Sequence, residues 1–101
     1  MQYFLLKLTP PRPTFPMDMS STEAAIMEEH FVYWRGLLAD SKAVVYGPVL
    51  DPSGVYGMAV LEVEDEHSAR EVGNSDPTIK AGAGFSFQIH PMPDARVRPQ
   101  R

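Results

Sequence analysis

The sequence predicts a small α+β domain, built from a four-stranded antiparallel sheet with helices packed on it. Four short runs are rich in aromatic, Leu and Val residues, which is typical of strands. A long segment between the first and second runs carries apolar residues at helical spacing. Gly and Pro separate most of these segments. With 101 residues, the chain is long enough for one compact domain with a small core, and too short for two.

The first half of the chain contains one strand, a proline-rich loop and the long helix. Residues 2–8 (QYFLLKL) predict the strand. Four prolines in residues 9–19 exclude a helix or a central strand there, and a loop of this length in a small domain is often functional. Ser20 and Glu23 fit a capping box that starts a helix reaching about residue 39. The apolar stripe of this helix comprises Ala24, Met27, Phe31, Trp34 and Leu38.

The second half predicts two strands, a short helix, a helical turn and a last strand, over residues 43–49, 55–64, 65–75, 76–82 and 84–91 in that order. The sequence DPSG at 51–54 predicts a turn that joins the first two of these strands as an antiparallel pair, because Pro52 fixes φ and Gly54 tolerates positive φ. Asp65 or Ser68 can cap the short helix.

The resulting order, β-α-β-β-α-β, is the signature of the ferredoxin-like fold, with two helices on one face of the sheet. Residues 2–8 and 55–64 are apolar on both faces, which indicates that the second face is buried as well. A second copy packed sheet to sheet is the simplest cover, so we expect a homodimer. In the last strand Ser86, Gln88 and His90 share one face, where they either line a wet cavity between the layers or form an ordinary solvent-facing edge.

Composition excludes several classes of function. The net charge is −4 and no basic face is evident, so we expect no nucleic-acid partner. No apolar run is long enough for a membrane span and no signal peptide is evident, so we expect a cytoplasmic protein without a membrane partner. The absence of cysteine excludes disulfides, thiolate catalysis and cysteine-ligated metals. We expect residues 1–93 to form the domain and residues 94–101 a polar tail.

We expect neither a metal nor a cofactor. A metal site needs about three converging protein ligands, and the three histidines, His30, His67 and His90, show no His-x-x-x-His spacing. The AGAGF sequence at 81–85 lacks the following helix and the Lys or Ser/Thr of a phosphate-binding loop. Its glycines more simply permit the turn into the last strand.

Asp76 and His30 are the residues with the clearest chemical potential. Asp76 precedes Pro77, a pattern that favours an N-cap on a helical turn. A capping carboxylate accepts backbone N–H bonds that favour its ionised form, so it makes a poor proton donor and a good anchor for an imidazole N–H. His30 lies at the edge of the apolar stripe, and imidazole exchanges protons near neutral pH. On residue type alone, a capping Asp and a helix-boundary His are the simpler interpretations.

Three stretches together resemble the YCII-related domain family: EEHFVYWRGLL at 28–38, VVYGPVLDPSGVYGMAVLEVE at 44–64 and DPTIKAGAGFSFQIHPM at 76–92. The shared pattern is a helical His ahead of an aromatic pair, Gly-Pro after the second strand and Asp-Pro before the last strand. The resemblance implies a ferredoxin-like fold and a dimeric α/β barrel. It also implies a pocket that holds a His and an Asp as a proposed active site, which correspond to His30 and Asp76.

The resemblance implies a small-molecule enzyme in which His30 transfers a proton and Asp76 orients it. The reaction would be an elimination, a dehydrochlorination or an isomerisation of a small ring compound. The candidate substrate-binding residues are Arg12, Tyr33, Trp34, Ser86 and His90. Core packing for Trp34 and a solvated loop position for Arg12 are the simpler alternatives. A non-catalytic dimer that binds a metabolite or a partner protein in the same cleft is the alternative function.

Overall fold

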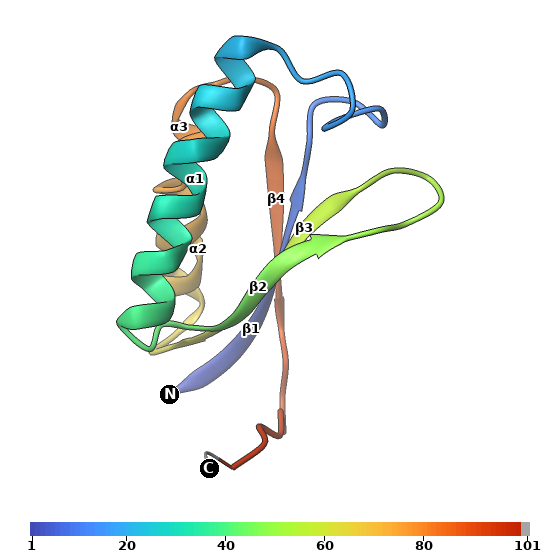
Figure 1. Ribbon diagram of the computed structural model, residues 1–101. Coiled ribbons are helices and arrows are strands. Elements are labelled where there is room, and N and C mark those ends of the chain that lie inside the picture. Colours follow the sequence, from blue (N-terminus) through green and yellow to red (C-terminus); the bar gives the residue numbers. More distant parts are fainter. Residues whose placement is uncertain (100–101) are drawn as a thin grey trace.

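The computed structural model describes residues 1–99 (Figure 1). Its elements are β1 (Gln2–Thr9), α1 (Ser21–Ala39), β2 (Ala43–Val49), β3 (Tyr56–Val63), α2 (Glu66–Asn74), α3 (Pro77–Lys80) and β4 (Ser86–Pro91). The predicted order is therefore confirmed, and the expected helical turn is the short helix α3. The last two residues of the predicted tail, 100 and 101, lie outside the described residues.

The four strands form one antiparallel sheet in the order β2-β3-β1-β4. The three helices pack on the same face of this sheet (Figure 1). Sheet order and helix placement agree with the predicted ferredoxin-like fold. The two central strands, β1 and β3, pair from Gln2 opposite Val63 to Leu8 opposite Gly57.

The core lies between the sheet and the helices. Its strand residues share one face because strand side chains alternate: Phe4 pairs with Leu61, and Leu6 pairs with both Ala59 and Ile89. From the helices, the buried residues of this core are Trp34, Leu37, Ala69 and Val72. Burial of these apolar side chains supplies the main force that holds the helices against the sheet.

The opposite face of the sheet carries no helix (Figure 1). At its centre Leu5 lies opposite Val60, and Val60 lies opposite Val45 on the other side. On β4 the same face presents Ser86 and His90, both exposed. The uncovered face is thus apolar at its centre and polar along the β4 edge.

The start of α1 follows the predicted capping box. The Ser20 side chain accepts the Glu23 backbone N–H at 3.1 Å, and the Glu23 carboxylate accepts the Ser20 backbone N–H at 2.9 Å. The predicted stripe needs a correction, because Leu37 is buried and Leu38 is exposed. The buried line continues from Trp34 by three residues rather than four, and both spacings lie near one helical turn.

The proline-rich loop is ordered by its own turns. Backbone hydrogen bonds link Phe15 to Arg12, Met17 to Thr14 and Met19 to Pro16, at 2.9 to 3.2 Å.

Among the described residues, no helix has the length and apolar character needed to cross a membrane.

Candidate functional site

His30 and Asp76 meet in the structure, although they are far apart in the chain. The Nδ1 atom of His30, on α1, lies 3.0 Å from both carboxylate oxygens of Asp76. Asp76 reaches this position because it caps α3: its side chain accepts the Thr78 backbone N–H at 2.9 Å. The packing of α1 against α3 therefore brings the two groups together.

The Asp76 carboxylate is buried and fully engaged. One oxygen accepts the Trp34 indole N–H at 2.7 Å, and the other accepts the Thr78 hydroxyl at 2.8 Å. Burial raises the pKa of Asp76, but hydrogen bonds from His30 and Trp34, the charge of His30 and the Thr78 N–H together lower it below its ordinary value. Asp76 is therefore an ionised acceptor at neutral pH.

The hydrogen bond to Asp76 defines the tautomer of His30. An ionised carboxylate can only accept hydrogen bonds, so Nδ1 must carry the proton. In the neutral ring, Nε2 is then the atom with the free lone pair. Within residues 1–99, Nε2 has no hydrogen-bond partner, and no buried side-chain N or O lacks one, so Nε2 keeps some access to the surroundings. His30 thus has Nδ1 anchored on Asp76 and Nε2 available to accept a hydrogen bond or a proton.

A cavity of about 380 Å³ lies beside His30, between α1, the sheet and the proline-rich loop. This volume is in the range of small-molecule sites, at its lower end. Its wall is largely apolar and includes Leu6, Leu8, Phe15, Met27, Phe31 and Phe85. His30, Trp34, Tyr46 and Tyr56 are the lining residues with polar side-chain atoms. The arrangement offers one proton-transfer group at the edge of an apolar chamber.

The model of the YCII-related domain family matches residues 1–93 of the chain. The chain belongs to this family. No curated protein matches it. Family membership covers the whole sheet, all three helices and both members of the His30–Asp76 pair.

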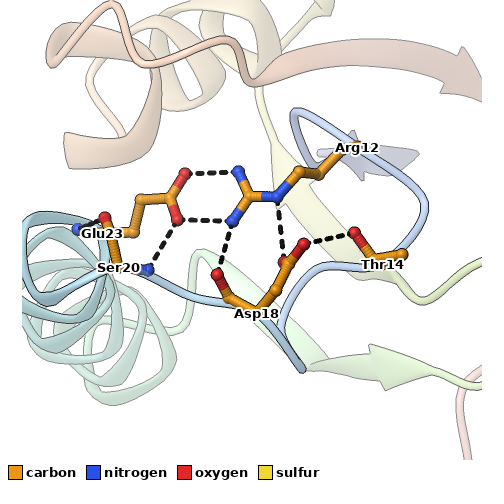
Figure 2. Close-up of polar contacts among 5 residues, drawn as sticks. All are labelled: Arg12, Thr14, Asp18, Ser20 and Glu23. Atoms are coloured by element: carbon orange, nitrogen blue, oxygen red, sulfur yellow. Dashed lines mark hydrogen bonds and ion pairs between the residues drawn. The ribbon is translucent and has the colours of Figure 1, made fainter.

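Two predicted binding residues of this YCII-related domain are engaged elsewhere. The guanidinium of Arg12 pairs with Glu23 and Asp18, and Arg12 does not line the cavity (Figure 2). The hydroxyl of Tyr33 donates to the Val72 backbone carbonyl at 2.6 Å. Burial, followed by the nearby Asp76 charge, raises the pKa of Tyr33 to about 12, so this phenol stays protonated.

The other three predicted binding residues are divided between the two faces of the sheet. Trp34 lines the cavity with its ring while its N–H holds Asp76. Ser86 and His90 lie on the uncovered face, and the Nε2 atom of His90 is 3.2 Å from the Gln88 side-chain oxygen. They do not line the cavity of this YCII-related domain.

Sequence reasoning missed several contacts and lining residues of this candidate site. Trp34 was among the expected binding residues, and only its hydrogen bond to Asp76 was missed. Thr78 follows Asp76 by two positions, a spacing at which Asp side chains commonly bond the backbone, so this contact was open to prediction. Trp34 follows His30 by four positions, which places both on one helix face where they can share a carboxylate. No local signal marks Phe15, Tyr46 or Phe85 as cavity residues, because strand and loop packing brings them there. Within residues 1–99, no three His, Cys, Asp or Glu side chains gather to hold a metal ion.

Proposed function

We propose that this YCII-related domain is a small-molecule enzyme in which His30 carries out general acid–base chemistry on a ring compound bound in the cavity. The observation that supports the proposal is the anchored imidazole: Nδ1 is held by Asp76 at 3.0 Å, and the ring borders an apolar cavity. Positioned imidazoles of this kind typically contribute about 10²–10⁴-fold to a rate.

In the proposed step, Nε2 of His30 accepts a proton from a carbon or hydroxyl of the substrate. The imidazolium that forms donates Nδ1–H to the ionised Asp76, whose charge stabilises it. If the electron pair left behind expels a substituent, such as chloride in a dehydrochlorination, the result is an elimination. If the proton returns to another atom of the ring compound, the result is an isomerisation.

We also propose that a second copy of the chain covers the bare sheet face, as the family resemblance implies. The apolar centre formed by Leu5, Val45 and Val60 supports this proposal, because Val45 is 48% exposed in the single chain and apolar surface gains from burial. His90 and Ser86 would then lie at the contact between the two sheets.

The test is a turnover screen of hydroxyquinols, chlorinated hydroxyquinols and related enols, followed by NMR. We expect His30→Gln to lower turnover by at least about 100-fold. His67→Gln is the matched control, because His67 is exposed on α2 and pairs with Glu71 there. A folded His30→Gln variant with unchanged turnover would contradict the proposal.

A non-catalytic ligand-binding role is the second candidate. The observation that favours it is the nearly complete apolar lining, which is sufficient to bind a ring compound without any chemistry. Under this alternative, ligands would raise the melting temperature of both the natural chain and His30→Gln, and no product would form with either.

A further inference from the structure

The proline-rich loop forms one wall of the cavity. Pro10, Phe15, Pro16 and Met19 line it. Phe15 is buried, with 4% of its surface exposed, although it belongs to a loop. Its ring packs edge-on against Phe85 with 5.3 Å between centroids. A loop with a buried aromatic anchor of this kind is a built part of the chamber.

Arg12 clamps this loop to the first turn of α1 (Figure 2). Its two terminal nitrogens donate to the Glu23 carboxylate at 2.8 and 2.7 Å, and its Nε donates to Asp18 at 2.9 Å. Thr14 holds the other Asp18 oxygen at 2.6 Å. The Arg12 guanidinium also lies 5.7 Å from the centre of the Phe15 ring. A lone surface ion pair contributes little to stability, but a bidentate network such as this one fixes the position of the loop relative to α1.

The charges of the clamp are secure at neutral pH. The Glu23 carboxylate accepts hydrogen bonds from Arg12 and from the Ser20 backbone, and these lower the pKa of Glu23 to about 2. Hydrogen bonds to Glu23 and to Asp18 raise the pKa of Arg12 above its ordinary value. Two other loops also approach the segment closely: a Cβ added at Gly84 would lie 2.9 Å from Pro11, and one added at Gly54 would lie 3.3 Å from the Pro13 backbone. The wall is therefore packed against neighbouring loops as well as clamped to α1.

The chemistry of the lining limits the charge of the ligand. Within residues 1–99, no Lys, Arg, Asp or Glu side chain lines the cavity. Arg12 is committed to Glu23 and Asp18. Lys7 alternates with the buried Leu6 and Leu8, so it lies on the uncovered face of the sheet, with its ammonium 4.6 Å from the centroid of the Tyr56 ring, and it does not line the cavity. Among the lining residues that the structure describes, only the His30 imidazole can become a cation, and its charge would already be paired with Asp76. A carboxylate or phosphate in the cavity would therefore lose its hydration with little compensation, which is a large cost.

We propose that the cavity accepts an uncharged, mostly apolar ring compound, and that the Arg12-clamped segment 10–19 sets the largest ring it admits. The inference rests on the proposed function in taking the cavity beside His30 as the ligand site. In it, Arg12 is a positioning residue, which acts through Phe15 and Pro16, and does not contact the ligand.

The first test compares ring compounds of matched ring size with and without a negative charge. Calorimetry would measure the affinities of phenol and 2-naphthol against those of benzoate and 2-naphthoate. We expect each carboxylate to bind at least about 100-fold more weakly than its uncharged partner. Carboxylates that bind as tightly as the uncharged compounds, or uncharged compounds that do not bind at all, would overturn the inference.

The same titration separates this inference from the proposed function. Binding of 2-naphthol by His30→Gln, with no turnover of any screened compound by the natural chain, would leave the ligand class standing without the chemistry. Turnover of a carboxylate that requires His30 would leave the chemistry standing and overturn the ligand class.

The second test loosens the clamp. We expect Arg12→Gln to change the ratio of 2-naphthol to phenol affinity by about tenfold in favour of the larger ring. Arg70→Gln is the matched control, since Arg70 pairs with Glu66 on the surface of α2, and it should leave the ratio unchanged. If Arg12→Gln does not fold, Phe15→Ala is the alternative variant. It enlarges the cavity directly, and it should shift the affinity ratio in the same direction. An unchanged ratio in either folded variant would overturn the role of the wall.

Discussion

The Asp76 carboxylate joins local structure to the site. It caps α3 through the Thr78 N–H and holds His30 and Trp34 on α1. Each of these partners donates a hydrogen bond to the carboxylate. If an amide NH₂ replaced one carboxylate oxygen, two donors would face each other and neither would have an acceptor. The residue is therefore expected to matter for stability as well as for chemistry.

We predict that Asp76→Asn lowers the free energy of unfolding by about 1–3 kcal/mol. The amide NH₂ would face the Trp34 indole N–H or the His30 Nδ1–H, and buried donors would be left without acceptors. Urea denaturation measures the change. Asp40→Asn, at the exposed end of α1, should stay within about 0.5 kcal/mol of the natural chain. An equal effect of both substitutions would count against the network.

The lowered pKa of Asp76 also predicts an acid dependence. Its pKa is below the ordinary 3.8 in the folded chain, so its ionised form stabilises the fold fully at pH values above about 4. This contribution is lost as the pH falls through the folded pKa. The stability difference between the natural chain and Asp76→Asn should therefore shrink below about pH 4. Urea denaturation at several pH values checks it, and a constant difference would refute the assignment.

At the scale of the element, α2 depends on a close approach to β4. A Cβ added at Gly73 would lie 2.4 Å from the Phe87 ring, a distance that real contacts do not allow. Glycine at this point lets the helix lie directly on the aromatic ring. In α1, by contrast, nothing lies within 4 Å of a Cβ added at Gly36.

We predict that Gly73→Ala destabilises the fold by about 1–2 kcal/mol, because overpacking outweighs the gain in helix propensity. Gly36→Ala is the matched control, since it adds the same methyl group to a helix without a clash. It should stabilise the fold by up to about 1 kcal/mol. Thermal and urea unfolding of the two variants give the comparison. A stabilising effect of Gly73→Ala would contradict the prediction, because it would show that the Phe87 ring moves aside at little cost.

At the scale of the whole molecule, the bare sheet face is the surface that the proposed second copy would cover. We predict that sedimentation finds the mass of two chains, and that Val60→Lys shifts it to one chain. A lysine there would place a charge in the proposed apolar contact, which is costly. Val32→Lys is the matched control, because Val32 is 58% exposed on α1, away from the sheet face. A monomeric natural chain would refute the dimer.

Local patterns predicted the elements of this fold well. The capping box at Ser20 and Glu23 and the Asp76-Pro77 start of α3 depend on neighbours within four residues, so the sequence alone could predict them. For α2 the sequence left Asp65 and Ser68 as alternatives, and the structure shows Asp65 as the cap. The burial of Leu37 rather than Leu38 could not be predicted from the sequence, because it depends on the rotation of α1 about its axis relative to the sheet.

The His30–Asp76 pairing was expected from the family resemblance, while residue types alone favoured simpler roles. Arg12 is a residue whose contacts the sequence did not predict. It was expected as a candidate ligand-binding cation, and in the folded chain it pairs with Asp18 and Glu23 instead. A partner at a distance of 6 or 11 residues, across a loop of several prolines, cannot be assigned from spacing.

The sequence by itself determined the order of strands and helices and the caps at their ends, because these arise from contacts between near neighbours. The tertiary structure decided which side chains share the Asp76 carboxylate, which cation holds the loop and where the cavity lies. Those outcomes depend on the packing of segments that are far apart in the chain. Their relative positions follow from burying the whole core at once, and no local pattern records them.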